Sequence, residues 1–120
     1  MTPDGTSHAP AWFDISTPDA PRARRFYQDM FDWPVNVLDD IYALVGTEGG
    51  QPTGGIGQAG PDSPYTGIVV YFQVDDVDTA LAQAEKLGGS RILEPRDLPG
   101  MGRMAVFGDP DGNPVGLLSP

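Results

Sequence analysis

Few side chains in this sequence could carry nucleophilic or acid–base chemistry. The 120 residues include no cysteine and one histidine, His8, in a polar N-terminal segment. Without cysteine, neither a thiolate nucleophile nor a disulfide framework is possible. Asp14 lies in the middle of an alternating apolar segment and could act as a general base if the fold buries it. The alternative is an ordinary solvated or hydrogen-bonded aspartate.

An acidic pair, Asp109 and Asp111, lies in the run Asp-Pro-Asp-Gly-Asn. Proline fixes φ, glycine accepts a positive φ, and Asp and Asn side chains bind nearby backbone, so this composition predicts a tight turn. The short apolar run over residues 115–118 fits a final strand. We therefore predict a closing hairpin of residues 103–107 and 115–118, in which the acidic pair serves the turn and not a metal.

Apolar periodicity predicts two similar series of elements. In the first half, a strand over residues 11–17 leads to a helix that Asp19 caps and Pro34 ends, and three strands follow. The second half repeats this order, with Asp76 as the helix cap. The strands expected after the first one cover residues 35–38, 41–45, 54–57, 67–74, 91–93, 103–107 and 115–118.

The two predicted helices share a register. A shift of 57 positions maps Asp19 onto Asp76 and Tyr27 onto Ala84, within matching apolar stripes. A stripe at helical spacing is expected to pack on a sheet. The stripe residues are Ala20, Ala23, Tyr27, Met30 and Phe31 in the first helix and Val77, Ala80, Leu81, Ala84 and Leu87 in the second.

This internal duplication predicts an α+β fold of two tandem βαβββ modules. We expect one domain over residues 1–120, with modules at about 10–58 and 67–119, a linker at 59–66 and a mobile arm at 1–9. Each helix would cover one face of its strands. The other faces would form a curved sheet that lines a shared cleft.

The composition narrows the expected partners. A formal net charge of −10 repels phosphate backbones and anionic membranes, so neither nucleic acid nor membrane is expected as a partner. No stretch approaches the ~20 apolar residues that span a bilayer. The N-terminal segment also lacks the apolar core of a secretion signal. We therefore predict a cytoplasmic location.

Three motifs resemble the vicinal oxygen chelate superfamily, which includes glyoxalase I, bleomycin-resistance proteins and extradiol dioxygenases. They are the Asp19 cap followed by Arg25-Phe26-Tyr27, the helix start Val74-Asp75-Asp76-Val77-Asp78, and the turn Asp109-Pro110-Asp111-Gly112-Asn113. The resemblance covers about Ala11 to Leu118. It implies the two-module fold, but not one activity, because unrelated activities share this scaffold.

Enzymes of this superfamily hold a divalent metal with His and Glu on inward-facing strand positions. Matched through the motifs, those positions fall on Trp12, Gly57, Val69 and Gly116. None offers the imidazole or carboxylate that such metals require, and His8 lies outside them. The resemblance therefore implies a protein without a metal site or another cofactor.

Strand alternation predicts which side chains line the cleft. If Phe13 and Ile15 pack under the first helix, Trp12, Asp14 and Ser16 face inward. If Val70, Phe72 and Val74 are core in the second module, their strand neighbours face inward. Gly57 and Gly116 would leave room where metal ligands stand. The predicted ligand-binding residues are Trp12, Asp14, Tyr42, Gly57, Val69, Tyr71, Gln73, Arg103 and Gly116.

Each of these predictions has a plainer alternative. Trp12 and Tyr71 could fill the cleft as core residues, and Tyr42 and Arg103 could pack in a hairpin or lie on the surface. Trp33 is expected in the core and not in the site.

Two functions of different classes remain. The first is a metal-independent protein that binds an aromatic or conjugated organic molecule, since a pocket with aromatic walls suits a flat ligand. The second is a metal-independent isomerase, lyase or cyclase in which Asp14 or Tyr71 has a shifted pKa. A structural or partner-binding dimer is a third reading. A homodimer is expected because each half exposes strand edges and because members of the resembled superfamily commonly pair.

Overall fold

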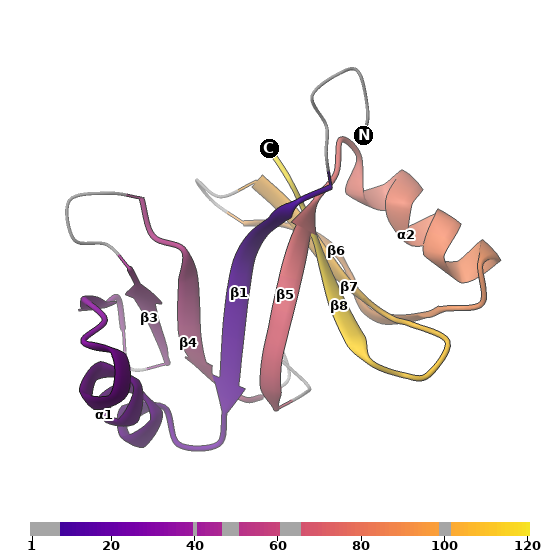
Figure 1. Cartoon of the computed structure of the whole chain (residues 1–120). Helices are drawn as coiled ribbons and strands as arrows, with labels where there is room; N and C mark the ends of the chain where they lie inside the picture. Colours follow the sequence, from indigo (N-terminus) through magenta and orange to yellow (C-terminus); the bar gives the residue numbers. More distant parts are fainter. Residues whose placement is uncertain (1–7, 40, 47–50, 61–65, 99–101) are drawn as a thin grey trace. The chain divides into compact units, whose positions relative to one another are not determined.

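The computed structural model describes residues 8–39, 41–46, 51–60, 66–98 and 102–120 (Figure 1). The chain divides into two compact units. The first unit is Trp12–Val69, and the second is Val70–Pro120 together with the N-terminal residues up to Ala11. Each unit carries one helix and strands that together follow the predicted order. The α+β class and the two βαβββ modules are thus confirmed.

The first module contains β1 (Pro10–Thr17), α1 (Ala20–Phe31), β2 (Val35–Val37), β3 (Tyr42–Val45) and β4 (Gly54–Gln58). Its strands lie in the order β2-β3-β4-β1. β1 and β4 run parallel, with Asp14 opposite Gly55. β3 and β4 run antiparallel, with Tyr42 opposite Gly57.

Helix α1 has a side-chain cap at its start and a left-handed residue at its end. The Asp19 carboxylate accepts a hydrogen bond from the Arg22 backbone N–H at 3.1 Å, which caps the first turn. The helix ends at Asp32, whose φ of 55° is left-handed. Its buried face packs on Ile15, Val45 and Ile56, and the partly buried side chains against this cluster are Phe13, Ala23, Tyr27, Trp33 and Val35.

The prediction that Met30 and Phe31 pack on the sheet is wrong. Their side chains are 63% and 51% exposed. Trp33 takes the core contact instead: its ring packs against the buried cluster and lies 5.6 Å from the Tyr27 ring. Phe31 stacks on the Trp33 ring at 4.9 Å and remains on the surface. Trp33 itself packs against the core, as the sequence predicted.

The second module contains β5 (Gly67–Gln73), α2 (Val77–Lys86), β6 (Ser90–Leu98), β7 (Gly102–Gly108) and β8 (Pro114–Ser119). Its strands lie in the order β5-β8-β7-β6. β5 and β8 run parallel, with Tyr71 opposite Gly116. α2 packs on the sheet through a core of Val74, Val77, Leu81, Ala105 and Leu117.

Two predicted core residues of this module are exposed. Leu87 is 71% exposed because α2 ends at Lys86 and the chain then turns at Gly88, whose φ is 103°. Val70 is 37% exposed although it shares the strand face of Val74. The Val74 side of β5 is covered by α2, and this cover does not extend to Val70.

Strand β6 is longer than the predicted segment 91–93. It spans nine residues and passes through Pro95. Its pairing with β7 shifts register between Arg91 and Leu93 and again between Leu93 and Arg96. Such irregularities disrupt the alternation on which strand prediction depends. The remaining elements match their predicted ranges to within one or two residues.

The described end of the predicted N-terminal arm is bonded to a strand. The Gln73 backbone N–H donates to the Ala9 carbonyl at 3.1 Å, and His8 Nδ1 lies 3.1 Å from the Gln73 carbonyl oxygen. Residues 1–7 of the arm lie outside the described residues. Among the helices in the described ranges, none has the length and apolar character needed to cross a membrane.

Candidate functional site

Within the described residues of the first unit, no helix packs on one of the two faces of its strands. Because Phe13 and Ile15 pack with the core under α1, alternation along β1 directs Trp12, Asp14 and Ser16 to the opposite face. We call this the helix-free face of the first sheet. The strand registers add Gly55 and Gly57 of β4 and Tyr42 and Leu44 of β3 to it.

On this face Tyr42 reaches across a neighbouring strand to Asp14. The Tyr42 hydroxyl donates a hydrogen bond to Asp14 Oδ1 at 2.9 Å, although β4 lies between β3 and β1. The ring can lie across β4 because that strand has glycine at both positions beneath it. A Cβ at Gly57 would be 2.9 Å from Tyr42 Cδ1, and a Cβ at Gly55 would collide with the phenol oxygen.

Asp14 has an unusual electrostatic environment. Burial raises the pKa of its carboxyl from 3.8 to about 6, while the hydrogen bond from Tyr42 acts in the opposite direction. The only arginines of the first unit are on α1, which covers the other face of the sheet. A carboxyl with a pKa near neutrality can exchange a proton at physiological pH.

The equivalent face of the second sheet is built differently. Tyr71 is 4% exposed and Val69 is 1% exposed. Gln73 shares their strand face by alternation but has an exposed side chain. The Tyr71 ring lies over Gly116 of β8, so that a Cβ at Gly116 would collide with the ring. Tyr71 therefore packs closely over Gly116, as the core-like alternative for Tyr71 proposes.

The prediction that Gly57 and Gly116 leave open room is wrong. A tyrosine ring occupies the space above each glycine: Tyr42 from β3 above Gly57, and Tyr71 from β5 above Gly116. The two glycines are repeat partners, yet their rings come from different strands. A short-range pattern could have indicated the first pair, because alternate glycines in β4 are what a crossing aromatic ring requires.

Arg103 does not join these faces. Its guanidinium bonds Asp78 of α2 at 2.8 and 3.1 Å and Asp97 of β6 at 3.0 Å, so it lies on the helix-covered side of the second sheet. This bonding lowers the pKa of Asp78. Alternation explains the correction, since Met104 and not Arg103 is on the strand face opposite the α2 core.

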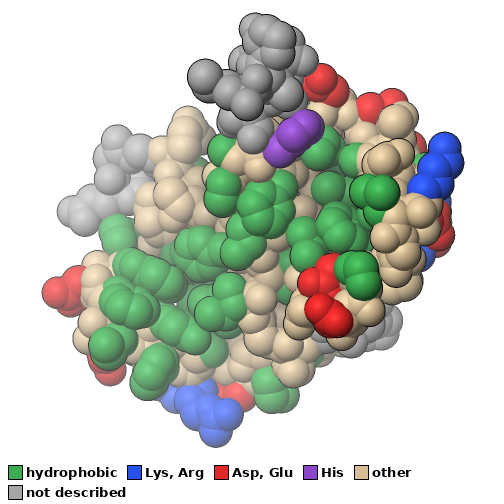
Figure 2. All heavy atoms as spheres, turned by 45° about the vertical axis from the view of Figure 1, so that its right-hand side comes forward, with side chains coloured by type: hydrophobic (Ala, Val, Ile, Leu, Met, Phe, Trp, Pro, Cys, Tyr) green, Lys and Arg blue, Asp and Glu red, His purple; other side chains and the backbone are tan. Residues whose placement is uncertain are grey.

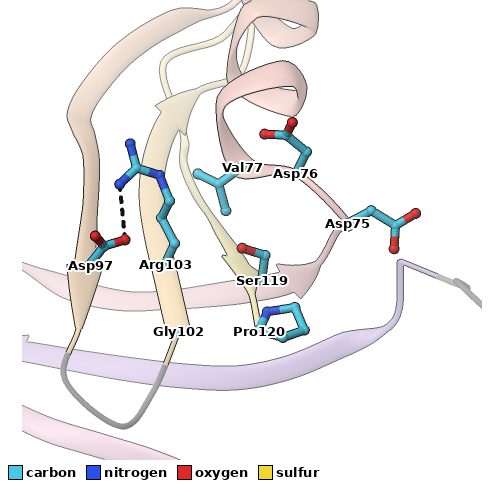
Figure 3. A pocket seen from close by; sticks show the side chains of 8 residues that line it. All are labelled: Asp75, Asp76, Val77, Asp97, Gly102, Arg103, Ser119 and Pro120. Carbon is cyan, nitrogen blue, oxygen red and sulfur yellow. Dashed lines mark hydrogen bonds and ion pairs between the residues drawn. The ribbon is translucent and has the colours of Figure 1, made fainter.

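Arg103 instead lines a hollow of about 450 Å³ in the second unit (Figure 3). Carboxylates of Asp75, Asp76 and Asp97 lie around it, together with Val77, Gly102, Ser119 and Pro120. Figure 3 shows the ion pair between Arg103 and Asp97 across one side of this hollow. Because the guanidinium already binds two carboxylates, it is not available to attract an anionic ligand.

A second hollow of the same unit, of about 440 Å³, is mainly apolar. In Figure 2, hydrophobic side chains gather on this face beside the histidine. Exposed Leu87 is one of its lining residues, and His8 and Asp109 supply polar groups. The residues that line it are His8, Val74, Ala80, Gln83, Ala84, Leu87, Gly89, Phe107, Asp109, Pro110 and Leu117. This hollow was not predicted from the sequence.

The positions that hold a divalent metal in the resembled superfamily do not fit a metal here. Trp12, Gly57, Val69 and Gly116 lack an oxygen, sulfur or imidazole donor in their side chains. Rings also lie over both glycines. Elsewhere in the described ranges, no three His, Asp or Glu side chains gather as a possible ligand set.

Comparison with known proteins agrees with this fold. Residues 9–117 match the family described as the Glyoxalase/Bleomycin resistance protein/Dioxygenase superfamily. The anthracycline biosynthesis protein DnrV of Streptomyces peucetius is 35% identical, in an alignment that covers 87% of this chain and 44% of DnrV. The chain thus spans less than half the length of that relative.

Two solved structures share the fold at low identity. The NAD-dependent benzaldehyde dehydrogenase from Legionella pneumophila has a TM-score of 0.64 at 20% identity, over 90% of this chain and 96% of that one. A homoprotocatechuate 2,3-dioxygenase variant from B. fuscum has a TM-score of 0.68 at 21% identity, over 92% of this chain and 31% of that one. The resemblance of the three sequence motifs is confirmed, and the chain belongs to the glyoxalase/bleomycin resistance protein/dioxygenase superfamily.

Proposed function

We propose that this protein binds a planar aromatic or conjugated organic molecule on the helix-free face of the first sheet, without a resident metal. The observation that carries the proposal is the composition of this face: Trp12 and Tyr42 supply aromatic surface beside the half-buried carboxyl of Asp14. Flat ligands bind such surfaces through ring stacking and apolar burial, with one or two polar groups fixing their orientation.

The lack of ligand donors at the superfamily's metal positions supports a function that needs no metal. The likeness to DnrV supports an aromatic ligand, because anthracyclines are fused planar ring systems. DnrV is more than twice as long as the matching segment, so its role as a whole is not transferred to this chain.

The test is a Trp12→Ala variant in a binding titration with a fused aromatic probe, 2-naphthol. Loss of stacking and apolar contact should weaken binding by about 2 kcal/mol, or roughly 30-fold. The thermal stability should fall less than in Leu81→Ala, because Leu81 is fully buried and its truncation leaves a cavity costing about 2–5 kcal/mol.

Phe72→Ala is a second control, since Phe72 lies opposite Leu117 in the sheet and is remote from Trp12 in the sequence. It should lower stability and leave the affinity for 2-naphthol unchanged. Unchanged affinity in Trp12→Ala, combined with a melt as low as that of Leu81→Ala, would show that Trp12 is a core residue and that the binding proposal is wrong.

One observation favours a second candidate function, that of a metal-independent isomerase, lyase or cyclase. Burial raises the pKa of Asp14 to about 6, a value suited to a general base at neutral pH. An enzyme of this kind would exchange ligand protons with solvent. Incubation of a bound ligand in D₂O, followed by NMR, should then show deuterium incorporation with the wild type and none with Asp14→Asn. Recovery of the ligand unchanged in both cases supports binding alone.

A further inference from the structure

Asp14 has hydrogen-bonding capacity that the chain does not use. A carboxylate offers about four acceptor sites, and the Tyr42 hydroxyl fills one of them, on Oδ1. Within the described ranges Asp14 has no ion pair and no second hydrogen-bond donor. Burial of a carboxylate with one neutral donor is costly, so a further donor supplied by a ligand would be favoured strongly.

Tyr42 holds this carboxyl in a defined place. Its ring lies across Gly57 and Gly55, and any larger residue at either position would meet it. The ring therefore cannot leave β4 without losing its contact surface, and its hydroxyl stays directed at Asp14 Oδ1. Tyr42 is a positioning residue in this arrangement, and the carboxyl of Asp14 is the group left to meet a ligand.

Trp12 lies two residues before Asp14 on the same strand face. Residues i and i+2 of a strand are about 7 Å apart, a span that a fused bicyclic or tricyclic ring covers. A hydroxyl on such a ring donates in the plane of the ring. A flat molecule lying against Trp12 can therefore meet the Asp14 carboxylate edge-on through its hydroxyl.

We infer that Asp14, held by Tyr42, anchors the ligand and selects fused aromatic molecules that carry a phenolic hydroxyl. This inference rests on the proposed binding function and adds the chemical class of the ligand. Plain aromatic hydrocarbons and their methyl ethers would meet the same aromatic surface but leave the carboxylate without a donor.

The test compares 2-naphthol with its methyl ether, 2-methoxynaphthalene, in which a methyl group replaces the hydroxyl hydrogen. Equilibrium dialysis near neutral pH should give wild-type binding of 2-naphthol at least about tenfold tighter than that of its methyl ether, the effect expected of a hydrogen bond to a charged group. Asp14→Asn should reduce this preference to about threefold or less, and Tyr42→Phe should give an intermediate value.

Two further variants separate anchoring from general structural effects. Trp12→Ala should weaken the binding of both probes by a similar factor and leave the preference unchanged. Asp29→Asn, which alters an exposed carboxylate on α1, should behave as the wild type. Thermal melts of each variant establish that it is folded, and Asp14→Asn should melt no lower than the wild type because it removes a buried charge.

The outcomes distinguish this inference from the function on which it rests. Equal wild-type affinity for the two probes overturns the selection of phenols and leaves aromatic binding in place. A preference that survives in Asp14→Asn overturns the role of Asp14. If neither probe binds, the proposed function is wrong, and the selection fails with it.

Discussion

Asp14 differs from Asp78 and Asp109 in how its charge is compensated. Asp78 bonds the guanidinium of Arg103, and Asp109 accepts from the side chain and backbone of Asn113, so both have a lowered pKa. The carboxyl of Asp14 is half-buried and accepts a hydrogen bond from the Tyr42 hydroxyl, and its pKa is raised to about 6. Burial outweighs one neutral hydrogen bond, as expected when the charged form loses its water.

This raised pKa predicts a pH-dependent cost in stability. Since the folded-state pKa lies above the unfolded value of 3.8, the favourable contribution of Asp14 is fully present below about pH 4 and is lost as the pH rises through about 6. The free energy of unfolding of Asp14→Asn, relative to the wild type, should therefore increase by about 2–3 kcal/mol between about pH 4 and pH 8. Urea denaturation of both proteins at each pH measures it. A difference that does not change with pH would contradict the burial of this carboxyl.

At the scale of elements, two strands owe their close packing to glycine. β4 has Gly55 and Gly57 beneath the Tyr42 ring, and β8 has Gly116 beneath the Tyr71 ring. Glycine weakens a strand because it offers no side chain to pack. Here the aromatic ring from a neighbouring strand supplies that packing, and the ring in turn needs the space that glycine leaves.

We predict that Gly116→Ala destabilises the protein by about 1–3 kcal/mol, as expected for overpacking. The added methyl group would meet the base of the Tyr71 ring, which cannot move aside without moving the strand. Gly60→Ala is the matched control, since a Cβ there meets nothing within 4 Å. Thermal melts of the two variants make the comparison. Equal melting temperatures would show that the Tyr71 ring does not lie over Gly116.

At the scale of the whole molecule, the two copies of the module present different side chains at equivalent positions. Asp14 and Tyr71 are repeat partners, as are Trp12 and Val69, so the first module has a polar and aromatic face where the second has a buried apolar one. Either copy would need ligand donors to hold a metal at the superfamily's positions. Neither has them.

We therefore predict that the purified protein holds no stoichiometric Ni, Zn, Fe or Mn. Elemental analysis after dialysis should find far less than one such ion per chain. A value near one would overturn both this prediction and the residue matching that assigns Trp12, Gly57, Val69 and Gly116 to the metal positions.

We also predict a homodimer. Among the described strands, β2 and β6 stand at the ends of the strand order and have a hydrogen-bonded neighbour on one side only. Phe26, Met30 and Phe31 leave apolar surface on α1. Such edges and patches are commonly covered by a partner. Light scattering at micromolar concentration should give about twice the chain mass of 12.8 kDa. A mass equal to one chain would contradict the prediction.

Sequence alone determined the order and nearly all the bounds of the elements. The Asp19 and Asp76 caps and the Asp109–Asn113 turn are short-range signals, and the structure retains each of them. The 57-residue repeat then indicated the fold class, because two copies of one pattern require two copies of one unit. The length of β6 was underestimated because its register shifts interrupt the alternation of apolar and polar residues.

Only the tertiary structure decided which side chains meet. Tyr42 reaches Asp14 from a strand that is not its neighbour, and Arg103 turns to the acidic residues beside α2. Met30, Phe31 and Leu87 continue their stripes but are exposed, because the next part of the chain does not cover them. Periodicity records which residues share a face. Whether that face is covered depends on residues far away in the sequence, and so does the pKa of Asp14.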